Sequence, residues 1–215
     1  MRQFSTIIFF SIKKHTAIDT IDSQILSLLQ EMPPISLDEM SGIRLMNRTD
    51  TKFLANKAQL IQVLRLAQGS YYAQEIMGKR ITRYRTTYWD SDDYQFRVHQ
   101  AGRRPRTKVR VRTYEDSDGL TFLEVKKKNN HGKTKKKRIR VASQTEVFES
   151  GGDEFVTEKV GQSLHDFHPC LQNYFKRITL VNKGKTERLT IDFDIDYTNF
   201  DTNNKTNSDQ LVIIE

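Results

Sequence analysis

Hydrophobic residues recur every three or four positions in two stretches of the N-terminal part of the chain. In 16–31 they are isoleucines and leucines, and their spacing predicts an amphipathic helix that ends at Pro33 and Pro34. A second helix is predicted at about 57–68, where Gly69 stands in the position of a terminating glycine. Residues 1–15 have no clear period. The patterned part of the chain therefore begins with helices.

Hydrophobic and polar residues alternate from residue 76 onward, which is typical of strands with one buried face. Polar turns such as EDSDG at 115–119 and NKGK at 182–185 separate the alternating stretches. A mixed stretch at about 154–166 favours a helix instead. We predict strands at 80–89, 94–100, 108–114, 121–128, 134–141, 172–181, 187–197 and 211–215. The whole pattern predicts an α+β fold, mainly antiparallel β.

Charged residues share one side of several predicted strands. The stretch 108–114 places valines on one side and basic residues on the other, and the strands at 121–128 and 134–141 repeat this arrangement. One interpretation is a sheet face that lies in water. The other is a closed barrel lined with charge, because like charges on neighbouring strands destabilise the sheet unless an anion neutralises them. The residues on this side are Lys108, Arg110, Arg112, Tyr114, Phe122, Glu124, Lys126, Lys128, Lys136, Arg138 and Arg140.

Positive charge is concentrated in the same part of the chain. The 215 residues carry a formal net charge of +8, whereas 103–140 alone holds 15 Lys and Arg against 4 Asp and Glu, a net charge of +11. Such a segment indicates a polyanionic partner: nucleic acid, an anionic membrane surface or a phosphate chain. Repeated arginine favours phosphate, and the aromatic residues do not form the stacking platform of a nucleic-acid binder. Glu124 and Glu215, in the same layer, would hold a divalent metal ion that bridges phosphates.

Composition excludes several classes of protein. Cys170 is the one cysteine, so a disulfide-stapled secreted scaffold is excluded. The apolar run at 7–10 is far shorter than the about 20 residues of a membrane span, and we expect a cytoplasmic protein. His165 and His168 lie three residues apart, but we find no cysteine or acidic partner at ligand spacing and predict no metal site there.

Six short motifs follow one another through most of the chain. They are RTDTKF at 48–53, TTYWDS at 86–91, KVRVRTY at 108–114, EVK at 124–126, FKR at 175–177 and RLTID at 188–192. In this order they resemble the VTC domain, the polyphosphate polymerase domain of the vacuolar transporter chaperone family. We therefore expect residues 1–40 to form an N-terminal extension with one helix, and 41–215 to form a VTC-like tunnel domain.

The resemblance implies the fold of the triphosphate tunnel metalloenzymes, the CYTH-like superfamily. This fold is an antiparallel β-barrel of about eight strands around a basic tunnel, with flanking helices. The implied activity is that of a metal-dependent phosphotransferase, which transfers the γ-phosphate of ATP to a polyphosphate chain with the help of Mn2+ or Mg2+. Glu215 stands where the family carries its metal-binding carboxylate. The residues that would contact phosphate are Lys52, Arg110, Arg112, Lys126, Arg138, Arg177 and Arg188.

Two departures from the family pattern keep other functions open. The chain stops at Glu215, two residues before an expected lysine, so we expect a truncated C-terminus. Phe175 stands where catalytic members carry tyrosine. The alternatives are a tripolyphosphatase or nucleoside triphosphatase of the same fold, and a non-catalytic module that binds polyphosphate or inositol phosphates. We expect ATP, triphosphate and polyphosphate as partners and no nucleic acid, while a membrane-protein partner and the oligomeric state stay open.

Overall fold

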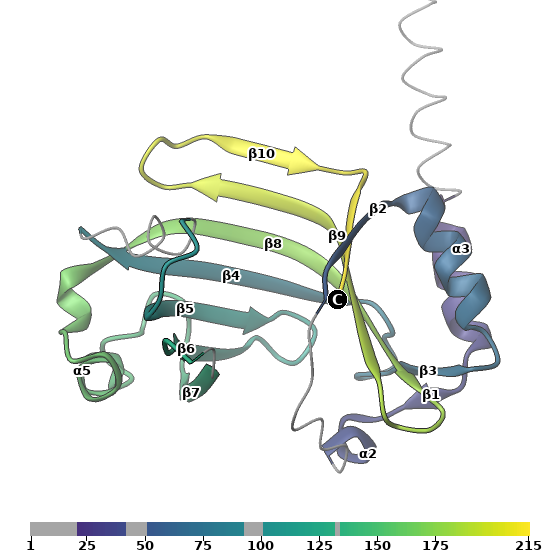
Figure 1. Cartoon of the computed structure of the whole chain (residues 1–215), viewed down its shortest axis with the longest axis horizontal. Helices are drawn as coiled ribbons and strands as arrows, with labels where there is room; N and C mark the ends of the chain where they lie inside the picture. The colour runs from purple at the N-terminus through teal and green to yellow at the C-terminus, as the bar shows by residue number, and fades with distance from the viewer. Residues whose placement is uncertain (1–20, 42–50, 93–100, 132–133) are drawn as a thin grey trace, which may run out of the picture. The chain divides into compact units, whose positions relative to one another are not determined.

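The computed structural model describes residues 21–41, 51–92, 101–131 and 134–215 (Figure 1). The chain divides into two compact units. Unit 1 takes its described residues from Met1–Ile81, Arg177–Phe193 and Gln210–Glu215, and unit 2 takes them from Thr82–Lys176 and Asp194–Asp209. The long strands β8 (Phe167–Asn182) and β9 (Arg188–Asn199) contribute to both units.

Unit 1 contains the two predicted helices. Residues 21–31 are helical, which confirms the described part of the helix expected at 16–31. Helix α3 (Lys57–Ala67) starts at a capping box, in which the Asn56 side chain accepts from the Gln59 backbone and the Gln59 side chain accepts from the Asn56 backbone. It ends just before Gly69, whose φ of +79° suits glycine. The shorter elements of this unit are β1 (Pro34–Ile35), α2 (Leu37–Ser41), β2 (Phe53–Asn56), β3 (Tyr71–Gln74) and β11 (Leu211–Ile214).

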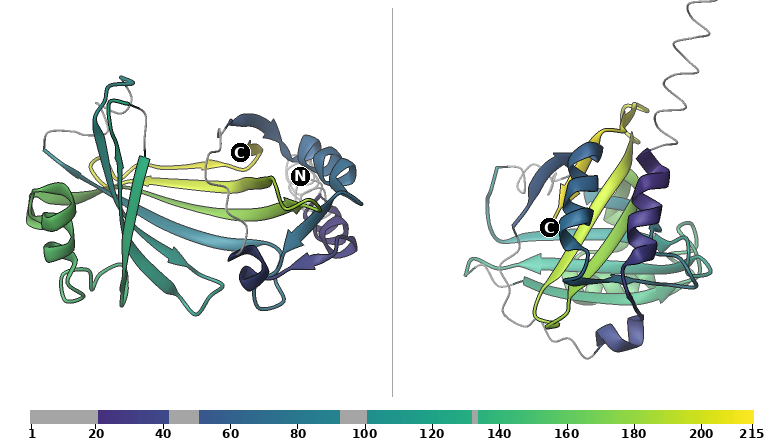
Figure 2. Two further views of the ribbon diagram at one scale, coloured as in Figure 1. Left: turned by 60° about the horizontal axis from the view of Figure 1, so that its bottom comes forward. Right: turned by 90° about the vertical axis from the view of Figure 1, so that its right-hand side faces the viewer.

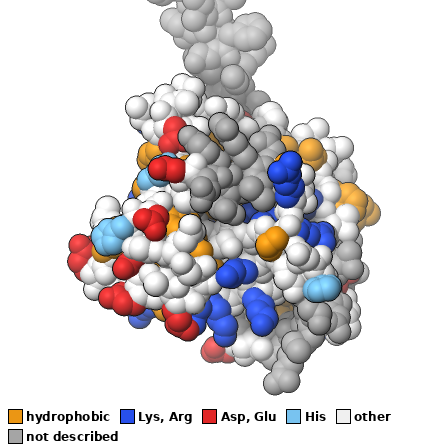
Figure 3. All heavy atoms as spheres, turned by 60° about the vertical axis from the view of Figure 1, so that its left-hand side comes forward, with side chains coloured by type: hydrophobic (Ala, Val, Ile, Leu, Met, Phe, Trp, Pro, Cys, Tyr) orange, Lys and Arg blue, Asp and Glu red, His pale blue; other side chains and the backbone are white. Residues whose placement is uncertain are grey.

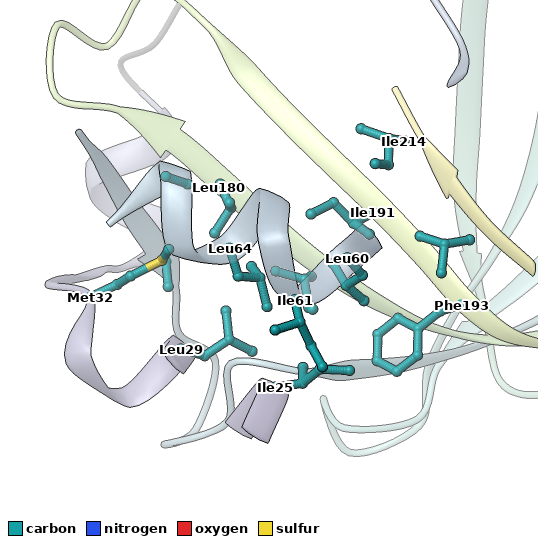
Figure 4. Close-up of a cluster of buried hydrophobic side chains, with 14 residues drawn as sticks. Ile25, Leu29, Met32, Leu60, Ile61, Leu64, Leu180, Ile191, Phe193 and Ile214 are labelled. Atoms are coloured by element: carbon teal, nitrogen blue, oxygen red, sulfur yellow. The ribbon is translucent and has the colours of Figure 1, made fainter. Parts of the chain in front are cut away.

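The core of unit 1 lies where both helices meet the sheet (Figure 4). Leu29 from the first helix and Leu64 from α3 are buried against Leu180 of β8 and against Ile191 and Phe193 of β9. Burying each such side chain contributes about 1.5–3 kcal/mol to folding. The helix of the expected N-terminal extension is therefore part of this core.

Unit 2 contains most of the predicted strands. The hairpin and third strand expected at 108–141 are confirmed, and the helix expected at about 154–166 is a short α-helix followed by a turn of 3-10 helix. The strand expected at 94–100 lies outside the described residues. The elements are β4 (Thr82–Ser91), β5 (Arg106–Tyr114), β6 (Leu120–Lys128), β7 (Thr134–Val141), α5 (Gly152–Val160), η1 (Leu164–Asp166) and β10 (Lys205–Ser208).

The strands form one sheet in the order β2-β11-β9-β8-β4-β5-β6-β7. The pairs β2–β11, β11–β9, β4–β5, β5–β6 and β6–β7 are antiparallel, and β1 pairs with β3 in parallel. The expected α+β fold with mainly antiparallel sheet is therefore confirmed. Among the described residues β2 and β7 end the order and do not pair with each other, so the sheet is not closed into a barrel. No helix in the described part of the chain is both long enough and apolar enough to span a membrane.

The two sides of β5, β6 and β7 differ as the alternation predicts. Val109, Val111, Leu123 and Val125 are buried on one side, where Phe155 and Val156 of α5 belong to the same apolar cluster. Figure 2 shows α5 and these strands from two further directions. Because the apolar side is covered, the charged side of the same strands faces away from this cluster.

Candidate functional site

Basic residues form three rows across β5, β6 and β7, on the side that we call the basic face. Because partners in an antiparallel pair point to the same side, the strand register places the residues of each row together. Figure 3 shows lysine and arginine side chains gathered on one face of the molecule, beside a group of acidic ones. The rows are Lys108, Lys126 and Lys136; Arg110, Glu124 and Arg138; and Arg112, Phe122 and Arg140.

Glu124 is the one carboxylate that these three strands contain, and it lies at the centre of the basic face. Its side chain is only 1% exposed. The guanidinium of Arg110 donates to Glu124 Oε2, with Nε and one terminal nitrogen each 2.7 Å from it, and Lys136 pairs with Oε1. One buried negative charge is thus shared by two cations, which leaves the face positively charged.

Arg112 is held mainly by neutral groups. It is 8% exposed, and its Nε donates to Thr86 Oγ1 at 3.0 Å. Its guanidinium carbon lies 5.5 Å from the ring centre of Tyr84 and 5.7 Å from that of Phe175. These two rings stack at 5.2 Å, so Phe175 helps to form an aromatic support that fixes the arginine by cation–π contact.

The exposed cations of the basic face are Lys126, Lys136, Arg138 and Arg140, of which Lys136 pairs with Glu124. Arg138 lies over the ring of Phe122 with its guanidinium carbon 4.2 Å from the ring centre. The neighbouring residues of β7, Lys135 and Lys137, are also exposed but alternate to the opposite side. Strand β7 therefore has exposed basic side chains on both of its sides, but only those of one side belong to the basic face.

Crowding of positive charge shows in the protonation equilibria of the basic face. Burial, together with the charges of Arg106, Lys126 and Arg110, lowers the pKa of Lys108 below its ordinary value. Burial also lowers the pKa of Lys136, with Arg110 adding to the effect and Glu124 opposing it. Both shifts mean that the cationic forms are disfavoured here. A bound anion would relieve this cost.

Tyr88 of β4 lies beside the same cations. Burial alone would raise the pKa of its phenol, but the charges of Arg110, Arg112 and Lys108 outweigh burial, so the pKa is lowered below its usual range.

We expect alkaline titration of tyrosinate absorbance to show one of the eight tyrosines ionising below the usual range. Tyr88→Phe should remove that phase, and the control Tyr72→Phe should keep it. Added tripolyphosphate should raise the pKa again if it binds here, because the anion offsets the arginine charges. A titration that is identical in all three proteins would contradict the assignment.

The other expected site residues lie in unit 1. Lys52 pairs with Glu215, and Arg177 makes a two-pronged ion pair with Asp192, at 2.5 and 2.6 Å. Arg188 is exposed at the start of β9. The structure thus gathers Arg110, Arg112, Glu124, Lys126 and Arg138 on the basic face of unit 2, and Lys52, Arg177, Arg188 and Glu215 within unit 1.

The carboxylates differ in how well they suit a divalent metal ion. The backbones of Glu215 and Thr190 exchange two hydrogen bonds, at 2.7 and 2.8 Å, which places Glu215 on the same side as Thr190 and Asp192. Carboxylate oxygens on a shared sheet side are the donors that Mg2+ and Mn2+ prefer, but Glu215 pairs with Lys52 and Asp192 with Arg177, so a metal ion bound here would have to displace a cation. Glu124 is surrounded by cations that repel a metal ion, and its contacts favour the positioning of Arg110 and Lys136 instead.

Four further residues belong to the basic face of unit 2 or to the charged residues of unit 1, although the sequence motifs did not identify them as site residues. They are Tyr88, Lys108 and Lys136 around the basic face, and Asp192 in unit 1. Strand alternation is the signal that places the two lysines on the basic face. The pairing of Asp192 with Arg177 needs the register between β8 and β9, which alternation within each strand does not set.

Comparison with known proteins gives a family match over most of the chain. The family model described as the VTC domain matches residues 47–215. No curated protein matches. Among solved structures, the chain is similar to a conserved hypothetical protein from Pyrococcus furiosus, with 10% identity, a TM-score of 0.37 and coverage of 76% of this chain and 77% of that one. A protein from Pyrococcus horikoshii OT3 is similar at 10% identity and a TM-score of 0.39, with coverage of 76% and 75%.

Proposed function

Because the chain belongs to the VTC domain family, we propose that it binds the triphosphate of ATP on its basic face and transfers the γ-phosphate to a polyphosphate chain. Membership of the family implies a role connected with polyphosphate. The proposal adds the substrate, the direction of transfer and the residues.

The observation that carries the proposal is the three-row basic face around a single buried carboxylate. Rows two residues apart along a strand are separated by about 7 Å, and neighbouring strands by about 4.8 Å. A linear polyanion laid over this grid meets cations in every row, because seven of the nine positions are lysine or arginine. Arginine also offers paired N–H groups that match the oxygens of a phosphate.

The proposed chemistry needs no activated side chain. Phosphoryl transfer is accelerated mainly by in-line positioning and by neutralising charge on the transferred group. In this proposal Arg110, Arg112, Lys126 and Arg138 bind phosphate oxygens. Glu124 and the ring of Phe175 keep Arg110 and Arg112 in fixed orientations.

The proposal extends to the cations and the carboxylate of unit 1. Lys52, Arg177 and Arg188 would add phosphate contacts, and Glu215 would hold Mn2+ or Mg2+. The bound ion would neutralise phosphate charge and orient the oxygens.

One incubation separates the proposed functions. The protein is incubated with ATP and Mn2+, or with ATP and Mg2+, and ADP, orthophosphate and chain length are measured. Polyphosphate with stoichiometric ADP supports the polymerase, whereas orthophosphate without chains indicates a hydrolase. Saturable tripolyphosphate binding without turnover indicates a binding module, which the phenylalanine at position 175 leaves open. Failure to bind tripolyphosphate, or displacement of it by duplex DNA of equal charge, would overturn all three.

A further inference from the structure

Two chain segments of unit 2 bring a histidine, a cysteine and an aspartate together, and none of the three belongs to the basic face. His168 and Cys170 lie two residues apart at the start of β8, and Asp201 lies in the turn between β9 and β10. Their candidate ligand atoms all lie within 4.8 Å of one another. The sequence showed no partner for His168, because Asp201 is 33 residues away and Cys170 was not expected to face the same ion.

The surrounding contacts keep these three groups close. The Phe200 backbone donates to the Cys170 carbonyl at 2.8 Å, which ties the turn that carries Asp201 to β8. The Cys170 thiol lies 3.3 Å from the His168 carbonyl. Because backbone contacts rather than flexible side chains fix the turn, the ligand atoms need only small side-chain movements to meet a common ion.

His168 also has the surroundings of a metal-ligating histidine. Its Nε2 faces Asp201, at 3.9 Å, while its Nδ1 faces Asp92, just after β4, at 3.8 Å. A metal-bound histidine commonly directs its second ring nitrogen to a carboxylate, which sets the tautomer and the ring orientation. Asp92 is fully exposed and lies beyond hydrogen-bond distance, so it would orient the ring only after a small side-chain movement.

A cavity next to the cluster provides access. It has a volume of about 370 Å3, and Asp92, His165, Asp166 and His168 are among the residues that line it. Of the three ligands only His168 lines this cavity, so an ion could reach the cluster from the side of His168.

We propose that His168, Cys170 and Asp201 form a binding site for a divalent transition metal ion of the zinc class, with Asp92 orienting His168. Imidazole, thiolate and carboxylate together suit Zn2+, whereas Mg2+ and Mn2+ prefer oxygen donors. Binding converts the Cys170 thiol to a metal-bound thiolate and releases its proton to the buffer, with no change in oxidation state. The ion would join the β9–β10 turn to the start of β8. This site is independent of the proposed phosphate chemistry.

The test measures Zn2+ and Co2+ binding by the purified chain after treatment with chelator. We expect one Zn2+ per chain in competition with a chromophoric chelator, and a near-ultraviolet sulfur-to-cobalt charge-transfer band with Co2+. Cys170→Ser should abolish the band, and His168→Ala should weaken Zn2+ binding by more than about tenfold. Asp92→Asn should weaken it less than His168→Ala does, because Asp92 acts only through the orientation of His168. The control His131→Ala removes an exposed histidine outside the cluster and should bind as the unaltered protein does.

Circular dichroism of each metal-free variant tests whether the chain still folds. The cobalt spectrum of the unaltered protein tests the site even if a variant does not fold. Absence of stoichiometric binding overturns the proposal, as does a cobalt spectrum without the sulfur band. Equal Zn2+ affinity in the unaltered protein and Cys170→Ser also overturns it, because exposed carboxylates alone would then account for binding.

Discussion

Replacing Lys126 and Arg138 together by glutamine is expected to weaken tripolyphosphate binding by about 100-fold or more. Each removes a charge-assisted hydrogen bond worth about 1.5–3 kcal/mol, and every 1.4 kcal/mol is a factor of ten in affinity. Both side chains are exposed, and neither is paired with the buried Glu124, so the change should leave the fold intact. Isothermal titration calorimetry with tripolyphosphate at fixed ionic strength measures the effect.

The matched control is the double change of Lys135 and Lys137 to glutamine. It removes the same amount of charge as the test variant, from two residues of β7 that lie on the side opposite the basic face. We expect the control to change affinity by no more than about threefold, since distant exposed charges act only through a screened field. Equal losses in the two double variants would show that tripolyphosphate responds to net charge and not to the basic face.

Glu124→Gln is expected to lower the free energy of unfolding by about 3–5 kcal/mol, the usual cost of removing one partner from a buried ion pair. Glutamine keeps the shape of the side chain but leaves Arg110 and Lys136 without their shared negative charge. Urea denaturation at neutral pH measures the loss, and the exposed Glu149→Gln serves as the control. A loss in Glu124→Gln no larger than in the control would contradict the central role of this carboxylate.

The same carboxylate predicts how stability depends on pH. Burial alone would raise the pKa of Glu124, but Arg110 and Lys136 outweigh burial and lower it below the ordinary value. A lowered pKa in the folded state contributes stability that is fully present above the unfolded pKa of about 4.3 and is lost as the pH falls below that value. The stability of Glu124→Gln should therefore fall less steeply in acid than that of the unaltered protein.

An anion should partly restore the Glu124→Gln variant. Tripolyphosphate would supply the negative charge that the variant lacks, and a ligand that binds only the folded state raises its stability. We expect a larger rise in melting temperature for Glu124→Gln than for the unaltered protein at the same tripolyphosphate concentration. Glu124 has two opposite effects on tripolyphosphate binding: it orients Arg110, and its negative charge repels the anion. A smaller rise in the melting temperature of Glu124→Gln would show that the orienting effect is the larger one.

Both predictions follow from one property of the basic face. It holds its arginines in place with a buried carboxylate and with aromatic rings, while leaving a positive charge that these supports do not cancel. A face that only had to be soluble would mix charges of both signs. Preorganised positive charge of this kind is what binding and transfer of phosphate require.

Strand alternation was sufficient to predict the sides of β5, β6 and β7. The period of two residues is a local property of extended backbone, so Arg110, Lys126 and Arg138 could be assigned to one side before any strand was paired. The helix ending near Gly69 was predictable for the same reason, since caps and apolar spacing act within a few residues. The short strands β1, β2, β3 and β10 were not predicted, because their two to four residues lack the continuous apolar run that marks the equally short β11.

The sequence by itself determined a mainly antiparallel protein, a shared basic side on three strands and membership of a polyphosphate-related family. Only the tertiary structure decided that Glu124 is buried between Arg110 and Lys136, and that His168 meets Asp201. It also decided that the sheet is not closed among the described residues. The physical reason is range: alternation depends on neighbours along the chain, whereas ion pairs, ligand clusters and sheet closure depend on contacts between distant segments, which local patterns do not encode.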